Sequence, residues 1–478
     1  MNNYKIRGGI VFYGREKELK KLNQMYGSDK FEFAVFYGRR RVGKTTLIRE
    51  FCKGKNAIYF VAREASGEVN LQNFSADVFG AKDKDKSGNS YFPDWEKAFE
   101  YIYNISIQER TILVIDEYPY LAGSYRPISS IIQAHIDMGL KDSKLFLILC
   151  GSSMSFMEYQ VLGYKSPLYG RRTAQFRVRP FTYFQSLPFF GGFNNEDKAV
   201  LYGITGGIPE YLSKINANIS LKENIISLYL SDSGALYEEP TNLIKQELRE
   251  PATYNGIIDA IASGASRLNE IATKNGIESN KCAKYLTSLM SLGIVKKEIP
   301  ITETISKKSI YLLEDQMFRF WYRFVFPNMS LIASDLGEEV YVSKIEPQLS
   351  TFMGLAFEDI CKQYMYENIK SAPFFFGNIG RWWGNNPKQK RQEEIDLMAF
   401  EGENALFGEC KWTNALVDID VLNDILEQSK LFHYKNNYFY LFAKSGFTQQ
   451  CVKRAKELGS VTLLCFEEMQ TVKQKIII

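Results

Sequence analysis

The chain has 478 residues, which is more than one hydrophobic core can organise, so we expect two to four domains. With 45% hydrophobic and 24% charged residues, its composition is that of an ordinary globular protein, and 59 basic against 55 acidic residues leave a net charge of only +4. So small a charge does not demand a nucleic-acid partner, although it leaves room for a local basic patch.

The cysteine and histidine content excludes several classes of site. Seven cysteines are scattered without a Cys-x-x-Cys pair, which indicates reduced thiols in a cytoplasmic protein and argues against a disulfide frame or a zinc site. Only two histidines are present, which argues against a histidine-based metal centre or a Ser-His triad. No apolar stretch approaches about 18 residues and the amino terminus lacks a signal-peptide core, so we expect no membrane association.

The first predicted elements lead into a phosphate-binding loop. An amphipathic helix within residues 12–26 precedes an apolar strand over 33–37. Two glycines with four residues between them and a following Lys-Thr pair then give the full P-loop spacing, and a helix continues from it. The residues that we expect to contact the nucleotide there are Gly38, Arg39, Arg40, Arg41, Val42, Gly43, Lys44, Thr45 and Thr46.

Each position of this loop has a mechanical reason. Gly38 and Gly43 let the backbone wrap around a polyphosphate without a Cβ in the way, so that successive N–H groups point inward. Lys44 carries its charge to the outer phosphates, and the Thr45 hydroxyl is placed for Mg²⁺. The helix that opens near Thr45 adds the positive end of its dipole, so the loop predicts a triphosphate such as ATP.

A second buried strand ends in two carboxylates. Residues 111–117 read as four apolar positions followed by Asp116 and Glu117. The carboxyl ends of strands in an open α/β sheet are where ligands bind, so this pair is expected beside the P-loop. Asp116 would order the Mg²⁺ through water, and Glu117 is the candidate base that polarises the attacking water.

Three further strands complete an α/β pattern. They are expected at 57–62, 145–150 and 174–179, with helices between them, and the order predicts a doubly wound parallel sheet. Ser152 follows the strand at 145–150, and its hydroxyl either senses the γ-phosphate or caps a helix.

Phe-x-Gly-Arg-Glu-x-Glu-Leu at 12–19, ahead of the P-loop, resembles the entry of the archaeal-type ATPase family, a branch of the AAA-related, STAND-like P-loop ATPases. The resemblance implies that Phe12, Gly14 and Arg15 line the adenine site, the alternative being that this amphipathic helix simply covers the sheet. It further implies that an extra strand lies between the P-loop strand and the Asp116 strand. It also implies an arginine finger at Arg171 or Arg172, the other interpretation being a surface pair. The Gly-Gly-x-Pro stretch at 206–209 is similar to the motif that follows the family's helical lid, which places the ATPase at 1–235 with its lid at 181–235.

Three short helices and a two-stranded hairpin follow within 250–330, an order typical of a winged helix. Its third helix and wing offer four exposed basic residues, which is few for DNA affinity, so DNA readout and a structural or protein-contact role both stay open. An aromatic run at 317–327 is expected to pack domains together. The residues that could face DNA are Lys281, Lys284, Lys296 and Lys297.

The last predicted domain, 345–478, holds a second group of chemical side chains. If 401–404 is a hairpin turn, the residue numbers of two cross-strand partners add up to 805. Asp396 then lies opposite Glu409, and Lys411 lies on the same face. Two carboxylates held that close repel unless a divalent cation, Mg²⁺ or Mn²⁺, lies between them. The lysine would orient a water or stabilise a pentavalent phosphate.

This pattern, with Glu358 on the preceding helix, resembles the PD-(D/E)xK nuclease superfamily, and Gln428 fits that superfamily's auxiliary position. The implied whole is a Mg²⁺-dependent ATPase coupled to a metal-dependent DNA nuclease, in a chain that can form a homo-oligomer. The alternative is an ATP-operated switch or DNA-binding regulator whose last domain does not cleave.

Overall fold

The computed structural model describes residues 12–82, 91–304, 308–387 and 389–471. By its internal contacts the chain divides into two units. The first comprises Met1–Phe181 with Ile208–Glu210, and the second comprises Thr182–Gly207 with Tyr211–Ile478. Most of the segment predicted as the ATPase lid therefore groups with the second unit, where helix α9 packs on α16 and α19.

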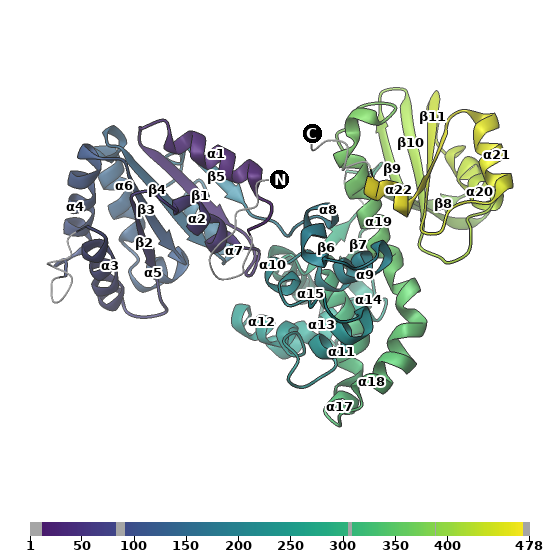
Figure 1. Ribbon diagram of the computed structural model, residues 1–478, viewed down its shortest axis with the longest axis horizontal. Coiled ribbons are helices and arrows are strands. Elements are labelled where there is room, and N and C mark those ends of the chain that lie inside the picture. The colour runs from purple at the N-terminus through teal and green to yellow at the C-terminus, as the bar shows by residue number, and fades with distance from the viewer. Residues whose placement is uncertain (1–11, 83–90, 305–307, 388, 472–478) are drawn as a thin grey trace. The chain divides into compact units, whose positions relative to one another are not determined.

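The first unit is built on a five-stranded, all-parallel sheet in the order β2-β3-β4-β1-β5 (Figure 1). The expected α/β fold with a parallel sheet is confirmed, and β4 is the strand that lies between the P-loop strand β1 and the Asp116 strand β3. Its strands are β1 (Glu32–Tyr37), β2 (Ala57–Val61), β3 (Thr111–Asp116), β4 (Leu145–Gly151) and β5 (Ala174–Arg177).

Helices cover both faces of this sheet because its central strands are apolar on both faces along most of their length. Alternate side chains such as Phe33 and Leu147 pack with the helices α3 to α6, while Phe146 on the other face meets Phe51 of α2. The helices of this unit are α1 (Glu16–Tyr26), α2 (Lys44–Cys52), α3 (Gly67–Lys82), α4 (Trp95–Gln108), α5 (Tyr118–Ser124), α6 (Ile128–Met138) and α7 (Met154–Phe156).

The second unit begins with helices and contains the predicted group of three helices and a hairpin, α13 to α15 with β6 (Val295–Glu298) and β7 (Ile310–Leu313). In the aromatic run 317–327 the aromatic side chains are buried except that of Phe326, which is exposed. The helices before the last sheet are α8 (Tyr183–Ser186), α9 (Asn195–Thr205), α10 (Pro209–Leu212), α11 (Leu221–Tyr229), α12 (Glu239–Glu247), α13 (Pro251–Ala262), α14 (Leu268–Lys274), α15 (Ser279–Ser291), α16 (Gln316–Phe320), α17 (Met329–Ile332), α18 (Gly337–Val340) and α19 (Leu349–Glu367).

The second unit ends in a mixed five-stranded sheet in the order β12-β11-β10-β9-β8. Helices α20 and α21 pack on one face, and α19 lies on the other, where Tyr364 meets Phe442 of the sheet. Its elements are β8 (Gly380–Asn386), β9 (Arg391–Glu401), β10 (Asn404–Lys411), α20 (Ile419–Ser429), β11 (Asn436–Ala443), α21 (Gln449–Leu458), β12 (Val461–Cys465) and α22 (Phe466–Thr471).

Strands β9 and β10 form the predicted hairpin, and the residue numbers of their partners add up to 805 from Asn404↔Glu401 to Gly408↔Leu397, as predicted. The regular pairing ends there, one pair short of Asp396 and Glu409, so these two residues are not a paired position of the ladder.

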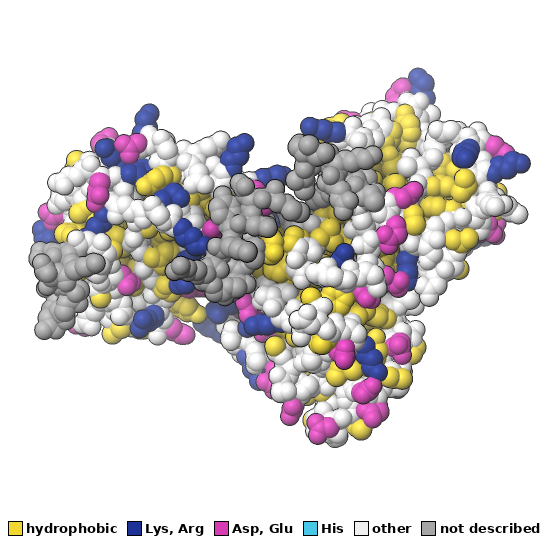
Figure 2. All heavy atoms as spheres, in the orientation of Figure 1, with side chains coloured by type: hydrophobic (Ala, Val, Ile, Leu, Met, Phe, Trp, Pro, Cys, Tyr) yellow, Lys and Arg dark blue, Asp and Glu magenta, His cyan; other side chains and the backbone are white. Residues whose placement is uncertain are grey.

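The surface carries both signs of charge interspersed over the face in view, in keeping with the small net charge (Figure 2). Among the described residues, no helix has the length and apolar character that crossing a membrane requires.

Candidate functional site

The loop between β1 and α2 has the shape that its glycines predict. Gly38 and Gly43 take φ angles of +151° and +86°, which favour glycine. A Cβ on Gly38 would stand 2.3 Å from the carbonyl oxygen of Val178, so only glycine fits there. Arg41 also has a positive φ of 68°, and this curls the predicted phosphate loop.

Lys44 is folded back into this loop. Its Nζ donates hydrogen bonds to the carbonyl oxygens of Gly38 at 2.8 Å and Arg39 at 2.9 Å. The side chain is buried, and burial lowers the pKa of the ammonium while the nearby Asp116 and Glu117 charges oppose the shift. A buried cation that bonds only carbonyl oxygens is poised to exchange them for an anion.

The two predicted acidic residues lie beside Lys44. Asp116 Oδ2 accepts hydrogen bonds from the Thr45 hydroxyl at 2.8 Å and from the Tyr59 hydroxyl at 2.7 Å. Glu117 Oε2 accepts a hydrogen bond from the Ser152 hydroxyl at 3.0 Å. The structure thus brings Thr45, Asp116, Glu117 and Ser152 together, from the start of α2 and the carboxyl ends of β3 and β4.

Oxygen donors at this point suit a hard cation. Thr45 and Asp116 offer a hydroxyl and a carboxylate 2.8 Å apart, which are ligands that Mg²⁺ prefers. Glycines at the positions where a Cβ would fill the loop leave its backbone open to a polyphosphate. The residues present therefore fit a Mg²⁺-nucleotide.

Sequence reasoning missed one neighbour of this site, Tyr59, and left the place of Pro209 open. Tyr59 is the middle residue of β2, where it pairs with Val114 of β3, and no local pattern distinguishes it from the other strand residues. Pro209 packs at the P-loop, because a Cβ on Gly43 would lie 3.7 Å from its Cγ. Arg15, expected at the adenine, donates to the carbonyl oxygens of Val42 and Arg179 and stacks 4.3 Å from the Phe181 ring.

Arg171 and Arg172 lie before the amino-terminal end of β5, whereas the P-loop follows the carboxyl end of the neighbouring strand β1. Strand β5 pairs in parallel with β1, Ala174 beside Ala34, so residues before Ala174 are about 13 Å or more from the P-loop along the strands. Arg171 is held by Asp137 in a two-point ion pair, with Nη2 to Oδ2 at 2.6 Å. Arg172 donates to the side chain of Gln175 at 3.0 Å.

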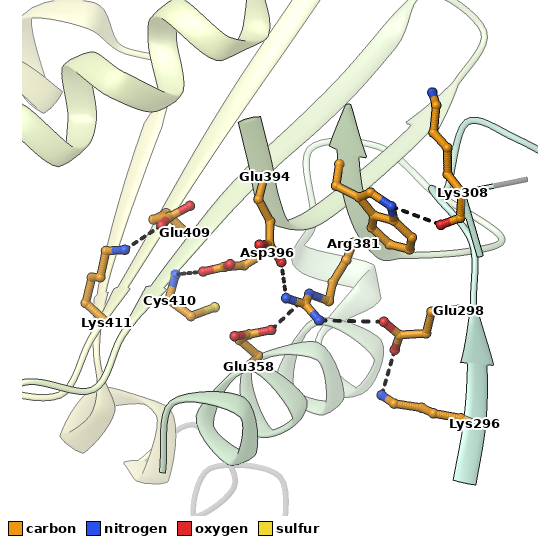
Figure 3. A network of polar contacts seen from close by, with 11 residues as sticks. Lys296, Glu298, Lys308, Glu358, Arg381, Glu394, Asp396, Glu409, Cys410 and Lys411 are labelled. Carbon is orange, nitrogen blue, oxygen red and sulfur yellow. Dashed lines mark hydrogen bonds and ion pairs between the residues drawn. The ribbon is translucent and has the colours of Figure 1, made fainter. Parts of the chain in front are cut away.

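In the second unit, Glu358, Asp396, Glu409 and Lys411 come from α19, β9 and β10 (Figure 3). Asp396 Oδ2 accepts the backbone N–H of Cys410 at 2.9 Å, and Glu409 Oε1 lies 2.6 Å from the Lys411 ammonium. The expected direct pairing of Asp396 with Glu409 is replaced by this contact with Cys410, because the ladder stops at Leu397.

The three carboxyl groups disturb one another electrostatically. Burial, reinforced by the Asp396 charge, raises the pKa of Glu358 to about 8 and that of Glu409 to about 7. Burial also raises the pKa of Asp396, against the Cys410 N–H and the Lys411 charge. The ionised form of a carboxyl group in such surroundings is favourable only when positive charge lies nearby.

Arg381 supplies part of that charge and was not predicted. Its guanidinium pairs with Glu394, lies 3.5 Å from Glu358 and lies 3.7 Å from Glu298 of β6 (Figure 3). These acids lie far apart in the sequence, so no local pattern could show the convergence.

Gln428 does not join this group. It donates to Glu393 at 3.0 Å, on the face of the sheet covered by α20, whereas Glu394 turns toward Arg381 on the other face. Over the part of the chain that the structure describes, no set of three or more Asp, Glu, His or Cys side chains has the geometry of a metal site.

The strand order, the glycine loop closed on Lys44 and the Thr45–Asp116–Glu117–Ser152 group define a P-loop ATPase. Residues 12–215 match a family described as an ATPase domain predominantly from Archaea, and residues 321–424 match a family of archaeal and bacterial proteins of unknown function. An uncharacterized protein of Methanocaldococcus jannaschii, MJECL04, is 35% identical over 431 residues, 88% of this chain and 92% of that protein. The chain belongs to the same family as this relative, and its amino-terminal part is an archaeal-type ATPase domain.

Two solved structures from Pyrococcus share weaker likeness. The Walker-type ATPase PABY2304 of Pyrococcus abyssi is 20% identical, over 65% of this chain and 96% of that one, with a TM-score of 0.49. A STAND protein with a tetratricopeptide repeat sensor, PH0952 of Pyrococcus horikoshii, is 16% identical, over 77% of this chain and 50% of that one, with a TM-score of 0.31.

Proposed function

We propose that this ATPase is Mg²⁺-dependent and controls a metal-dependent DNA nuclease in its carboxyl-terminal region, in DNA processing or defence. The single observation that carries the nuclease is the group of Glu358, Asp396 and Glu409, half-buried near Lys411, with the pKa of each raised. The ATPase assignment rests on the separate site at the P-loop.

In the ATPase, Lys44 exchanges the carbonyl oxygens of Gly38 and Arg39 for the outer phosphates of ATP. Thr45 and Asp116 would hold Mg²⁺, which neutralises charge on the phosphates when it is bound. Glu117 orients a water toward the γ-phosphate, and Ser152, hydrogen-bonded to Glu117, reports whether that phosphate is present. Water attacks phosphorus, the bond to the β-phosphate oxygen breaks, and ADP and phosphate leave.

In the nuclease, Asp396 and Glu409 would hold a divalent cation, Mg²⁺ or Mn²⁺, which supplies charge neutralisation at the scissile phosphate. Two carboxylates are enough for Mg²⁺, which usually retains several waters. Lys411 holds the attacking water or the developing charge on the phosphate, and Glu358 completes the acidic wall. Water adds to phosphorus, the P–O bond to the leaving sugar breaks, and the leaving oxygen takes a proton.

DNA contact is also assigned to helices α13 to α15 and the β6–β7 hairpin, which we interpret as a winged helix. Lys281 and Lys284 of α15 face outward with Lys297 of the hairpin, while Lys296 pairs with Glu298 at 2.7 Å. Affinity for DNA grows with the number of phosphates that are neutralised, and these few cations therefore give weak binding. Other parts of the chain must supply further contacts to the DNA.

One observation favours the alternative of an ATP-operated switch with a last domain that does not cleave. Arg381 already compensates Glu358 with its own positive charge, within 3.5 Å. An internal cation of this kind can stabilise the fold without any metal.

Digestion of plasmid DNA with Mg²⁺ or Mn²⁺, with and without ATP, separates the two functions. The nuclease predicts cleavage by the wild type and its loss in Asp396→Ala and Lys411→Ala, whereas Asp420→Ala, an exposed acid on α20, cleaves normally. If no protein cleaves under any of these conditions, the switch is the better description, and unchanged phosphate release in the variants would show that the ATPase survives.

A further inference from the structure

A cleft of about 280 Å³ lies beside the carboxylate cluster, within the second unit. Strand β6, helices α16 and α19, and strands β8 and β9 wall it, and both Glu358 and Asp396 line it. Figure 3 shows the side of this cleft where Lys296 and Glu298 of β6 face Arg381 and Glu358.

Lys362 contributes a positive charge to this cleft that no acid neutralises by contact. It follows Glu358 by one turn of α19, so the two side chains share a face of the helix. Within the described residues the Lys362 ammonium has neither a hydrogen bond nor an ion pair within 4.0 Å. Burial and the neighbouring Lys296 charge lower its pKa, against the opposing charges of Asp359, Glu298 and Glu314.

Arg319 of α16 is a second cation on the same wall. Its Nε and Nη2 atoms are buried and have no hydrogen-bond partner, which is costly for a guanidinium. The group is held in place 4.5 Å from the Phe352 ring centre. Its pKa, lowered by burial to about 10, still leaves it charged at neutral pH.

A second hollow of about 390 Å³ adjoins the cleft, since Arg319 and Leu355 line both, and it includes Arg323 and no acidic residue. We call the two hollows together the track. Its second hollow is lined by cations alone among charged residues, and its first carries Lys362 beside the wall that bears Glu358, Asp359 and Asp396. The net charge is small and the face in Figure 2 carries both signs of charge, so the protein as a whole does not attract a polyanion strongly. Attraction of a polyanion therefore depends on these local cations.

We infer that this track binds the phosphodiester backbone of a single nucleic-acid strand, with Lys362 and Arg319 on phosphates next to the one held at Asp396. The inference rests on the proposed nuclease and names its substrate. Lys362 has no acid in contact and can meet a phosphate oxygen, and Arg319, which lines both hollows, adds a fixed positive charge beside it. Hollows of this size, at the low end for small-ligand sites, take a flexible strand and exclude a duplex.

Binding is measured on the full-length chain in EDTA, where cleavage does not occur, by the fluorescence anisotropy of a dye-labelled 20-nucleotide single strand and of the same sequence as a duplex. Lys362→Gln and Arg319→Gln should each weaken single-strand binding several-fold at low salt. Each should also lower the slope of log affinity against log salt by about 0.7. Lys370→Gln, an exposed lysine just beyond α19 with the same change of charge, should bind as the wild type does.

Several outcomes overturn the inference and each is distinct from failure of the nuclease. If Lys362→Gln keeps the wild-type affinity and salt slope, or if only duplex binding falls, the track does not bind a single strand. The binding result for Arg319→Gln counts only if the melting curve of this variant matches that of the wild type. If it does not, the result for Lys362→Gln, a substitution at a partly exposed site, decides the question. If the variants bind the single strand more weakly but the wild type cleaves no plasmid, the track is supported and the nuclease is refuted. If the wild type cleaves plasmid but the variants bind as the wild type does, the nuclease is supported and the track is refuted.

Discussion

Glu117 is the residue on which hydrolysis depends, as distinct from binding. Its carboxylate lies at the end of β3, hydrogen-bonded to Ser152 at 3.0 Å, and touches none of the P-loop groups that would hold the phosphates. We expect Glu117→Gln to bind nucleotide as the wild type does, because the amide keeps the shape and the Ser152 contact. Phosphate release should fall by about 10²- to 10⁴-fold, the usual share of a general base.

A fluorescent ATP analogue measures the binding and a phosphate sensor measures the turnover. Lys44→Ala should lose both, since it removes the cation that faces the phosphates. Glu100→Gln, on the exposed surface of α4, is the matched control for the charge change and should alter neither. Equal turnover in Glu117→Gln and wild type would remove Glu117 from the reaction.

Gly38 gives a second residue-scale prediction, on stability. An alanine there would place its Cβ 2.3 Å from the Val178 carbonyl oxygen, at a φ of +151° that alanine rarely adopts. We expect Gly38→Ala to lower the free energy of unfolding by about 1–3 kcal/mol, the usual cost of overpacking.

Urea unfolding of the two glycine variants side by side checks this. Gly80→Ala, inside helix α3 with nothing within 4 Å of the added Cβ, should instead be neutral or stabilising, by up to about 1 kcal/mol. Equal effects of the two substitutions would show that the close approach at Gly38 has no energetic weight.

At the scale of elements, local pairing was predictable and distant convergence was not. The turn at 401–404 fixes the β9–β10 register up to Gly408↔Leu397, because a short hairpin leaves one pairing open. The order β2-β3-β4-β1-β5 joins parallel strands that lie far apart in the sequence. The family resemblance indicated only that one strand lies between the P-loop strand β1 and the Asp116 strand β3. Arg381 was missed for the same reason, since Glu298, Glu358 and Glu394 meet it from three elements.

Helix α19 carries the pH prediction. Its Glu358 has a pKa raised to about 8 by burial and by Asp396, so the folded chain holds a proton that the unfolded chain releases near its ordinary pKa of about 4.3. The folded state binds more protons between these two values. Its stability must therefore fall as pH rises through that window.

Melting curves in EDTA at pH 6 and pH 8 test this sign. Glu358→Gln cannot ionise, so its melting temperature should fall less between the two pH values than the wild type's. The expected difference is about 2–4 °C, the shift that 1 kcal/mol produces in a unit of this size. Glu367→Gln, an exposed residue at the end of α19, should behave as the wild type does, and a Glu358→Gln profile parallel to both would contradict the raised pKa.

At the scale of the whole molecule, the position of Arg171 and Arg172 bears on assembly. Both precede the amino-terminal end of β5, about 13 Å or more from the P-loop along the strands, which argues against a contact with the nucleotide of their own subunit. If either is an arginine finger, it acts on a neighbouring copy, and the active unit is an oligomer. Arg172 is the better placed of the two, because Arg171 is engaged in its ion pair with Asp137 and Arg172 has no ion pair among the described residues.

Mixing two inactive variants tests this arrangement. Lys44→Ala has no working P-loop but keeps the arginine finger. Arg172→Ala lacks the finger but keeps its P-loop. A mixed oligomer therefore contains a complete site where the P-loop of one subunit meets the finger of the other. Phosphate release by the mixture should exceed the sum of the separate proteins, and wild-type release per subunit should rise with protein concentration. Arg171→Ala paired with Lys44→Ala shows which arginine acts, while Arg323→Ala, an arginine of the second unit, should keep full ATPase activity. No recovery in either mixture, with release per subunit independent of concentration, would assign hydrolysis to one chain alone.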